Sequence, residues 1–519
     1  MKRLYVLIVA LATLLSAKAQ WVDDPTTNTI LANCPKNAGE VLISPKPSSD
    51  GFYIQYLHSA NNGWSPTVQL VNAEGERQWG DAGIHITTPN LASWSPGYAM
   101  AALNDGVASM FRTVDSAHWV VKINQDGTFP WGEYGVKLFD GEGGDRSELL
   151  STYDYNQDQG LWALGTDLQS SFLQYVNADG TLGNMATISD PTKKCTKGKL
   201  APAENGVFVV YAKRTLAKTA PYSKRIYVAG YNKDGEQVVP ETMLFGEFTA
   251  DGSLIHQVVP DNNGGAYVYQ DYYGSEGYSI YVTHFDATGT PTIADTCGVA
   301  VHSLDNYNTY TMACATVERN TNDLIIAYVQ EDAESQTPHR IFVNRITETG
   351  EVLLGDGNMV ADDMGQSSYN LFSVDADNET GGFVVIFATR QNTIEAVGFD
   401  KDNYLAWKTT LSSTSYNKTY GRRTSGFCEG QDVVAWINSQ DGGLYGQNIG
   451  IDGSMGPGVN VEENVVEDEE IVTLVRIINV NGQTMTCKDE NELTPGIYIL
   501  QGTNKDGMMV NKKIVLTKE

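Results

Sequence analysis

The sequence predicts an all-β protein whose body is a β-propeller of about eight four-stranded blades, followed by a small β-sandwich-like C-terminal domain. Three observations predict this class. A tight-turn signal recurs eight times, at intervals of 50 to 61 residues, in the chain of 519 residues. A second turn signal precedes it in every unit. Glycine, tyrosine and asparagine are abundant and helix-forming runs are few, which favours strands.

The recurring signal is a short apolar or alternating run followed by an acidic residue and glycine, such as VVKINQDG at Gly127. Asn403 replaces glycine in one unit. The turn glycines of the other seven units are Gly75, Gly127, Gly180, Gly235, Gly289, Gly350 and Gly453. Both residue types tolerate positive φ, which a tight hairpin turn demands. We therefore expect a hairpin at each of these positions.

The second signal lies ahead of the first, for example at Asp50-Gly51 and Asp105-Gly106, and β-rich runs such as FYIQYL follow it. The order within a unit is therefore inner strand, tight turn, buried strand, long loop, strand, tight turn and outer strand. Eight units imply eight blades, or seven if one terminal unit is degenerate. A two-sheet sandwich, the alternative, does not explain the even spacing.

The outer-strand pattern occurs once more, as NTILAN at residues 28–33, ahead of the first unit. An additional outer strand at the N-terminal end would complete the last blade, join the ends of the ring and remove exposed sheet edges. Residues 20–461 are therefore expected to form one closed domain, so that a chain of this length need not divide into several cores.

Residues 1–19 have the pattern of a secretory signal peptide. Lys2 and Arg3 give a positive start, residues 4–15 are apolar, and residues 17–19 (AKA) form a small-x-small cleavage site. A membrane anchor, the alternative, requires about 20 apolar residues. No later segment is long and apolar enough to span a bilayer, so we expect an exported protein without a transmembrane segment.

The composition excludes some partners and scaffolds. The formal net charge is −28, and loss of residues 1–19, which carry three cations and no acid, makes it −31. Such a surface does not suit a nucleic acid, because phosphates must be met by cations. The six cysteines are too sparse for a disulfide scaffold and show no C-x-x-C spacing. We expect mostly small buried thiols, with one or two bridges of undetermined pairing.

The C-terminal part differs in character from the repeats. Residues 462–470 are an acidic stretch that reads as a solvated linker. Residues 471–519 show a strand, a hairpin, a Pro-Gly turn into an apolar strand and a last hairpin, which together indicate a small β-sandwich-like module.

This module resembles the C-terminal sorting domain of the type IX secretion system over about 49 residues. The matching features are a strand ending in Asn481-Gly482, a Pro-Gly-Ile-Tyr segment and a basic strand near the end, although the usual Pro-Asn-Pro opening is absent. The residues that carry the sorting function by this resemblance are Pro495, Gly496, Tyr498, Gly507, Lys512 and Lys513. The resemblance implies export through the type IX secretion translocon and a secreted or outer-membrane cell-surface location. An ordinary accessory β-domain is the alternative.

The sequence contains no recognisable catalytic motif. Its seven histidines form no H-E-x-x-H, and neither a G-x-S-x-G elbow nor a phosphate-binding loop is present. Asp375-x-Asp377-x-Glu379 resembles a calcium loop but is better interpreted as a solvated turn. Asp126 to Trp131 resembles the Asp-box of sialidases with altered spacing, which favours a hairpin turn followed by a packing tryptophan. We predict no metal or cofactor.

Two function classes remain open. The first is a non-catalytic binding or scaffold protein for glycan, cell-envelope or protein ligands. The second is a secreted polysaccharide-degrading glycoside hydrolase or lyase, because propellers host both. The first is favoured because no catalytic constellation is visible, although paired carboxylates can be recognised only in space.

The binding face is expected on one side of the ring. The short Asp-Gly turns share one side, which should be inert, and the long loops share the other, where binding groups usually sit. Between residues 193 and 225, nine cations cluster with Glu204 as the only acid, which suits an anionic glycan or lipopolysaccharide. The candidate ligand-binding residues are aromatic (Trp64, Trp94, Tyr272, Tyr273, Tyr278, Tyr416, Tyr420) and basic (Lys213, Arg214, Lys218, Lys224).

Deletion of residues 471–519 should leave a folded body trapped in the periplasm, because the tail is predicted to be an address and not part of the core. Fractionation of the native host, with immunodetection of the body, measures this. Efficient export of the truncated protein would contradict the sorting prediction.

Overall fold

The structure is a computed structural model. It describes residues 21–34, 38–46, 48, 50–60, 63–86, 98–115, 117–140, 147–151, 160–167, 169–215, 222–250, 256–274, 277–302, 309–331, 339–365, 371–377, 379–416, 418–419, 430–438, 440–457, 473–479, 496–503 and 509–516. The chain divides into two compact units, Met1–Asn460 and Val461–Glu519. Residues 1–20, with the predicted signal peptide, lie outside the described residues.

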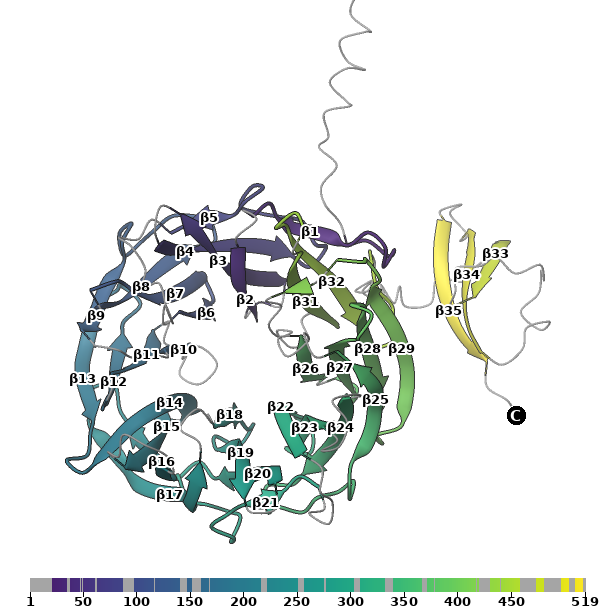
Figure 1. Cartoon of the computed structure of the whole chain (residues 1–519). Coiled ribbons are helices and arrows are strands. Elements are labelled where there is room, and N and C mark those ends of the chain that lie inside the picture. Colours follow the sequence, from purple (N-terminus) through teal and green to yellow (C-terminus); the bar gives the residue numbers. More distant parts are fainter. Residues whose placement is uncertain are drawn as a thin grey trace, which may run out of the picture. The chain divides into compact units, whose positions relative to one another are not determined.

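The first unit is a ring of eight antiparallel sheets with four strands each (Figure 1). Blade 1 comprises β2 (Ala38–Pro45), β3 (Gly51–Ala60), β4 (Gly63–Asn72) and β5 (Ile84–His85), and blade 2 comprises β6 (Ala99–Leu103), β7 (Gly106–Arg112), β8 (Ala117–Asn124) and β9 (Val136–Asp140). Blade 3 comprises β10 (Ser147–Ser151), β11 (Leu161–Thr166), β12 (Ser171–Val176) and β13 (Leu182–Ile188), and blade 4 comprises β14 (Lys193–Ala203), β15 (Gly206–Thr215), β16 (Tyr222–Tyr231) and β17 (Gln237–Ala250).

Blades 5 to 8 continue this order. Blade 5 comprises β18 (Gln257–Pro260), β19 (Ala266–Gly274), β20 (Gly277–Phe285) and β21 (Val299–Ala300), and blade 6 comprises β22 (Thr309–Val317), β23 (Leu324–Glu331), β24 (His339–Ile346) and β25 (Asn358–Met364). Blade 7 comprises β26 (Phe372–Ala376), β27 (Phe383–Ala388), β28 (Ile394–Phe399) and β29 (Leu405–Ser412). Blade 8 comprises β30 (Lys418–Thr419), β31 (Gln431–Asn438), β32 (Leu444–Gly450) and the N-terminal strand β1 (Thr29–Ala32). The prediction of an eight-bladed propeller is confirmed. The described residues contain no helix, and therefore none that could cross a membrane.

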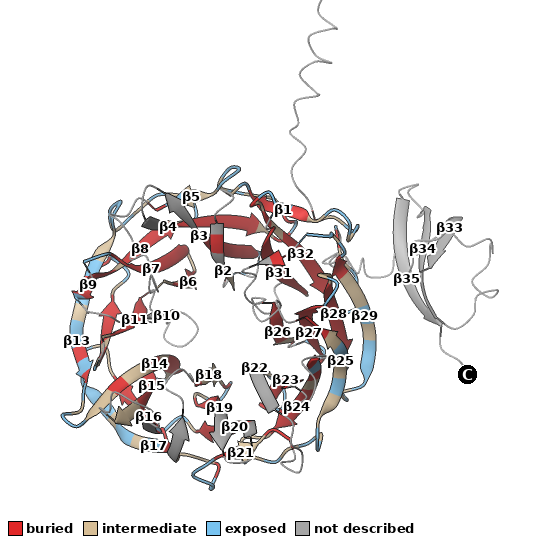
Figure 2. Ribbon diagram, viewed as in Figure 1, coloured by how far each residue is buried: buried red, intermediate tan, exposed pale blue. Residues whose placement is uncertain are grey.

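The hydrophobic core lies between the blades. The second and third strands are buried on both faces, as in β27 (FVVIFA), whereas outer strands such as β13 alternate with exposed residues (Figure 2). Eight hydrophobic clusters occur, and each combines residues of two neighbouring blades. A blade therefore shares its core with both neighbours and has none of its own.

Tight turns lock each blade to the one before it. All eight predicted turn residues have positive φ, from +65° at Asn403 to +88° at Gly350. At Gly180 a Cβ would lie 2.6 Å from the ring of Trp131, which belongs to the preceding blade and whose Nε1 donates to Ala178 O at 3.0 Å. Trp79 and Trp407 donate to the next blade in the same way. The interpretation of these tryptophans as packing residues is confirmed.

The ring closes at blade 8 as predicted. Strand β1 pairs antiparallel with β32, which places the N-terminal strand at the outer position of the last blade. Trp21, just ahead of β1, donates from Nε1 to Ala73 O of blade 1 at 2.7 Å. Gln447 donates to Val22 O, also at 2.7 Å. Backbone pairing and side-chain contacts thus join the two ends of the ring.

The expectation of a long loop between the second and third strands fails in blades 1 and 5. Residues 332–338 separate β23 from β24, but residues 61–62 alone separate β3 from β4, and residues 275–276 alone separate β19 from β20. These strands continue as paired hairpins beyond the blade core, which satisfies backbone hydrogen bonds that a long loop would leave to water. The term loop side is used below for this side of the ring, which also carries the connections between blades. The opposite side is the short-turn side.

The second unit contains β33 (Thr473–Asn479), β34 (Gly496–Thr503) and β35 (Met509–Leu516), in a three-stranded antiparallel sheet with β34 in the middle. Within its described residues this is one sheet, without the second layer of a sandwich. Of the predicted sorting residues, Gly496 and Tyr498 lie in β34, and Lys512 and Lys513 lie in β35. Pro495 and Gly507 lie outside the described residues.

The four described cysteines are all free thiols, so no bridge joins them. Cys195 and Cys314 are buried, Cys34 is half-buried and Cys297 is exposed. Burial raises the pKa of the Cys195 thiol to about 11. Cys428 and Cys487 lie outside the described residues.

Trp21→Ala should lower the free energy of unfolding by about 3 to 5 kcal/mol, because it empties a buried site and removes a hydrogen bond at the ring closure. Trp79→Ala is a matched control, since Trp79 makes the same kind of contact from blade 1 to blade 2, away from β1. Chemical denaturation followed by circular dichroism measures both. An equal or larger loss in the control would contradict a special role for the closure.

Candidate functional site

The basic segment between residues 193 and 225 forms β14, β15 and the first part of β16 in blade 4. Its register places Lys194 opposite Arg214, and Arg214 opposite Lys224. Residues directly opposite on neighbouring strands share a face of the sheet. We call these three residues the cation row. All three lie at the loop-side ends of their strands.

The cation row faces blade 5. Val210 and Ile226 of blade 4 pack with Val268 of blade 5 in one hydrophobic cluster. Alternate residues of a strand share a face, so Arg214 lies on the face of Val210 and Lys224 on the face of Ile226. Lys224 is 3% exposed, so this positive charge lies within the blade interface.

Lys213 lies on the other face of blade 4 and is engaged in ion pairs. Its Nζ is 2.7 Å from Glu241 Oε1 and 3.3 Å from Asp190 Oδ2. Burial opposes the charged form, but these two carboxylates outweigh it and raise the pKa of Lys213. This lysine therefore contributes less positive charge to the surface than the sequence suggests.

The predicted aromatic residues divide among several blades. In blade 5, Tyr273 pairs with Tyr278 and Tyr272 pairs with Ser279 in the hairpin of β19 and β20. This hairpin is at the loop side, next in the ring to the basic strands of blade 4. Trp64 pairs with Ser59 in blade 1, and Tyr416, 42% exposed, precedes β30 of blade 8. Trp94, Lys218 and Tyr420 lie outside the described residues.

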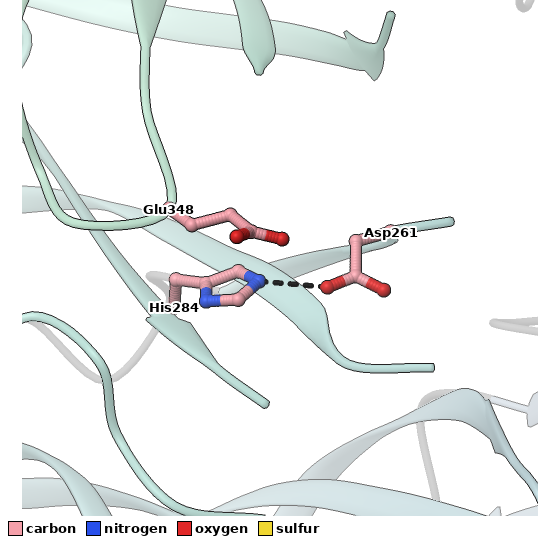
Figure 3. Close-up of side chains that lie close together, drawn as sticks. All are labelled: Asp261, His284 and Glu348. Atoms are coloured by element: carbon pink, nitrogen blue, oxygen red, sulfur yellow. Dashed lines mark hydrogen bonds and ion pairs between the residues drawn. The ribbon is translucent and has the colours of Figure 1, made fainter. Parts of the chain in front are cut away.

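A cluster that the sequence did not reveal lies on the short-turn side. Asp261 and His284 of blade 5 and Glu348 of blade 6 point toward one another, with their ligand atoms within 4.8 Å (Figure 3). His284 Nε2 is 2.9 Å from Asp261 Oδ2. Glu348 Oε1 accepts hydrogen bonds from the side-chain amides of Asn263, at 2.9 Å, and of Asn322. Asp261 and His284 are buried, whereas Glu348 is half-buried.

The Asp261 carboxylate is held in its ionised form. Burial opposes ionisation, but hydrogen bonds from His284 and from the N–H groups of Asn263 and Gly265 hold the pKa of Asp261 below its ordinary value. The two backbone N–H groups lie 2.8 and 2.7 Å from Oδ1. Oδ1 is thus occupied by the turn, and Oδ2 is directed at His284.

A signal for this cluster does exist in the repeats. His284 stands five residues before its turn glycine, the position that Lys122 and Arg345 occupy in blades 2 and 6. Lys122 Nζ lies 2.7 Å from Asp105 Oδ2, and Arg345 Nη2 lies 3.2 Å from Glu318 Oε2. Comparison of this one position across the units would therefore have marked His284 as the partner of an acid at the first turn.

Another pair of carboxylates lies between blades 7 and 8. Burial, followed by the facing Asp375 carboxylate, raises the pKa of Asp432 well above its ordinary value. Asp377, two residues after Asp375, instead accepts hydrogen bonds from the N–H groups of Glu379 and Thr380 in its own turn. Asp375 and Asp377, the first two acids of the calcium-like pattern, therefore face different partners: Asp375 faces Asp432, and Asp377 faces the N–H groups of its own turn.

Comparison with known proteins shows the fold only. No protein-family profile and no curated protein matches the chain. A Burkholderia pseudomallei lectin is 10% identical, with a TM-score of 0.44 over 70% of this chain and 98% of its own. An ulvan lyase bound to its saccharide is 10% identical, with a TM-score of 0.43 over 72% and 95%. A eukaryotic initiation factor is 13% identical, with a TM-score of 0.43 over 85% and 95%. At such values the likeness carries no argument about activity, which must come from this chain's own residues.

Asp432→Asn should stabilise the protein at neutral pH. A folded-state pKa above the unfolded value means that stability is fully present below about pH 4, the ordinary value for aspartate, and is lost as pH rises through the folded-state pKa. Because asparagine stays neutral, its advantage should grow as the pH rises. Thermal unfolding across a pH series measures this, with exposed Asp234→Asn as the control. A variant less stable than the parent throughout the series would contradict the raised pKa.

Proposed function

We propose that the protein is an exported, non-catalytic β-propeller that binds an anionic glycan on the loop side, between blades 4 and 5. The observation that carries the proposal is the cation row, in which half-buried Lys194 and Arg214 lie opposite each other on neighbouring strands and buried Lys224 lies opposite Arg214 on the third. In a chain of net charge −28, so dense a group of cations also attracts anions locally.

The neighbouring hairpin of blade 5 supports a saccharide over a simple anion. It carries Tyr272, Tyr273 and Tyr278 at the same side of the ring, and aromatic residues suit the apolar faces of sugar rings. Free acidic polysaccharides and lipopolysaccharide share this chemistry. Residues 1–19 and the sorting residues of the tail support export through the type IX translocon to the cell surface or the medium.

The second function class, a polysaccharide hydrolase or lyase, would need carboxylates that reach a substrate. The carboxylate pair between blades 7 and 8 does not meet this need, because Asp432 is completely buried. This pair therefore gives no support to catalysis.

Charge reversal in the cation row, Lys194→Glu together with Arg214→Glu, should weaken binding to sulfated or uronic-acid glycans at least about tenfold and flatten its salt dependence. Lys401→Glu together with Lys408→Glu, in and just before the outer strand of blade 7, makes a matched charge change away from the site. Glycan-array binding and calorimetry at two salt concentrations measure the effect, with lipopolysaccharide vesicles as a separate arm. Unchanged binding by the double variant, or no anionic glycan bound in either arm, would refute the proposal.

A further inference from the structure

We propose that Asp261, His284 and Glu348 form a site for a divalent transition-metal ion such as Zn²⁺, which joins blades 5 and 6 on the short-turn side. This site is separate from the proposed glycan site, because it lies on the opposite side of the ring. We infer the metal ion from the proton positions that the hydrogen bonds around His284 impose.

The hydroxyl of Thr292 fixes one ring nitrogen of His284. Thr292 Oγ1 lies 2.5 Å from the backbone oxygen of Glu348 and 2.8 Å from His284 Nδ1. A carbonyl oxygen can only accept, so the single hydroxyl proton of Thr292 is donated to Glu348 O. Nδ1 must then carry a proton and donate it to Thr292 Oγ1. A neutral imidazole in this position has its lone pair on Nε2.

The lone pair of Nε2 faces an acceptor. Asp261 Oδ2 lies 2.9 Å away, and the N–H groups of Asn263 and Gly265 donate to Oδ1 of the same carboxylate. Two acceptors at this distance require a cation between or beside them, which is either a proton on Nε2 or a metal ion. A histidine that uses Nδ1 for a hydrogen bond and Nε2 for the ion is the usual arrangement in metal sites.

Glu348 favours the metal ion over the proton. A proton shared by His284 and Asp261 needs no third group, yet a second carboxylate converges on the same place and is oriented by the amides of Asn263 and Asn322. Ligand atoms bound at about 2.1 Å are about 3.4 Å apart around a tetrahedral ion and about 3.0 Å apart at neighbouring positions of an octahedral one. The separation of 2.9 Å between His284 Nε2 and Asp261 Oδ2 is close to the octahedral value and would open by about 0.5 Å around tetrahedral Zn²⁺. A turn of the half-buried Glu348 side chain completes the set.

The donor set is mixed and has a buried aromatic neighbour. The ring centroid of buried Tyr267 lies 4.5 Å from that of His284, with the two planes tilted by 54°. One imidazole and two carboxylates suit Zn²⁺ or Mn²⁺, whereas Ca²⁺ and Mg²⁺ prefer oxygen ligands alone.

The test uses the untagged full chain, stripped with a chelator and titrated with Zn²⁺ by calorimetry. We expect one equivalent to bind, to raise the midpoint of thermal unfolding, and to bind at least about tenfold more weakly to Glu348→Gln. Glu351→Gln, an exposed change in the same turn, should bind like the parent. His284→Ala should abolish binding, but Glu348→Gln keeps the test valid if that variant fails to fold.

Cobalt substitution separates this site from the free thiols. Co²⁺ should give absorption bands of nitrogen and oxygen coordination without a thiolate charge-transfer band, and Glu348→Gln should remove them. Absence of Zn²⁺ and Mn²⁺ binding would overturn the proposal and leave a doubly protonated His284 as the cation. Equal Zn²⁺ affinity in the parent and Glu348→Gln, or a thiolate spectrum, would overturn it as well.

Discussion

The pairing of β1 with β32 is the interaction on which the propeller depends. Every hydrophobic cluster lies between two blades, so separating any pair exposes apolar surface on both. The chain crosses all eight interfaces, because β1 of blade 8 is followed directly by β2 of blade 1. Strand β1 itself is held to the rest of blade 8 without a direct chain connection, by its pairing with β32. Trp21 and Gln431, which both donate to Ala73 O, at 2.7 and 2.8 Å, add contacts between the two ends of the ring.

The fold was largely predictable because its rules are local. A positive-φ residue such as Gly127 or Asn403 marks each hairpin, and strands buried on both faces read as continuous apolar runs such as FVVIFA. The spare strand at residues 28–33 could be recognised for the same reason. The extent of the β3–β4 hairpin could not be predicted, because the sequence does not distinguish a loop from strands that continue beyond the core.

The candidate sites were predictable to different degrees. The cation row comes from one stretch of sequence, and its charge was visible there, although its register and the ion pairs of Lys213 were not. Asp261 and Glu348 come from turns of two different blades and His284 from the end of strand β20, and Asn263 and Glu348 are 85 residues apart. Their convergence depends on how blade 5 packs against blade 6, which no spacing within one unit records. The short-turn side was expected to be inert because it carries the short Asp-Gly turns.

The tryptophan contacts have a direction. Trp79, Trp131 and Trp407 each reach forward from one blade to the next, and Trp21 does the same across the closure. This is the head-to-tail geometry of a cyclic oligomer, in which a ring forms only when the rotation between neighbours divides a full turn. For eight blades that rotation is about 45°. Gain or loss of one blade by duplication or deletion would thus require a new angle at every interface, and the number of blades is a property that all the interfaces share.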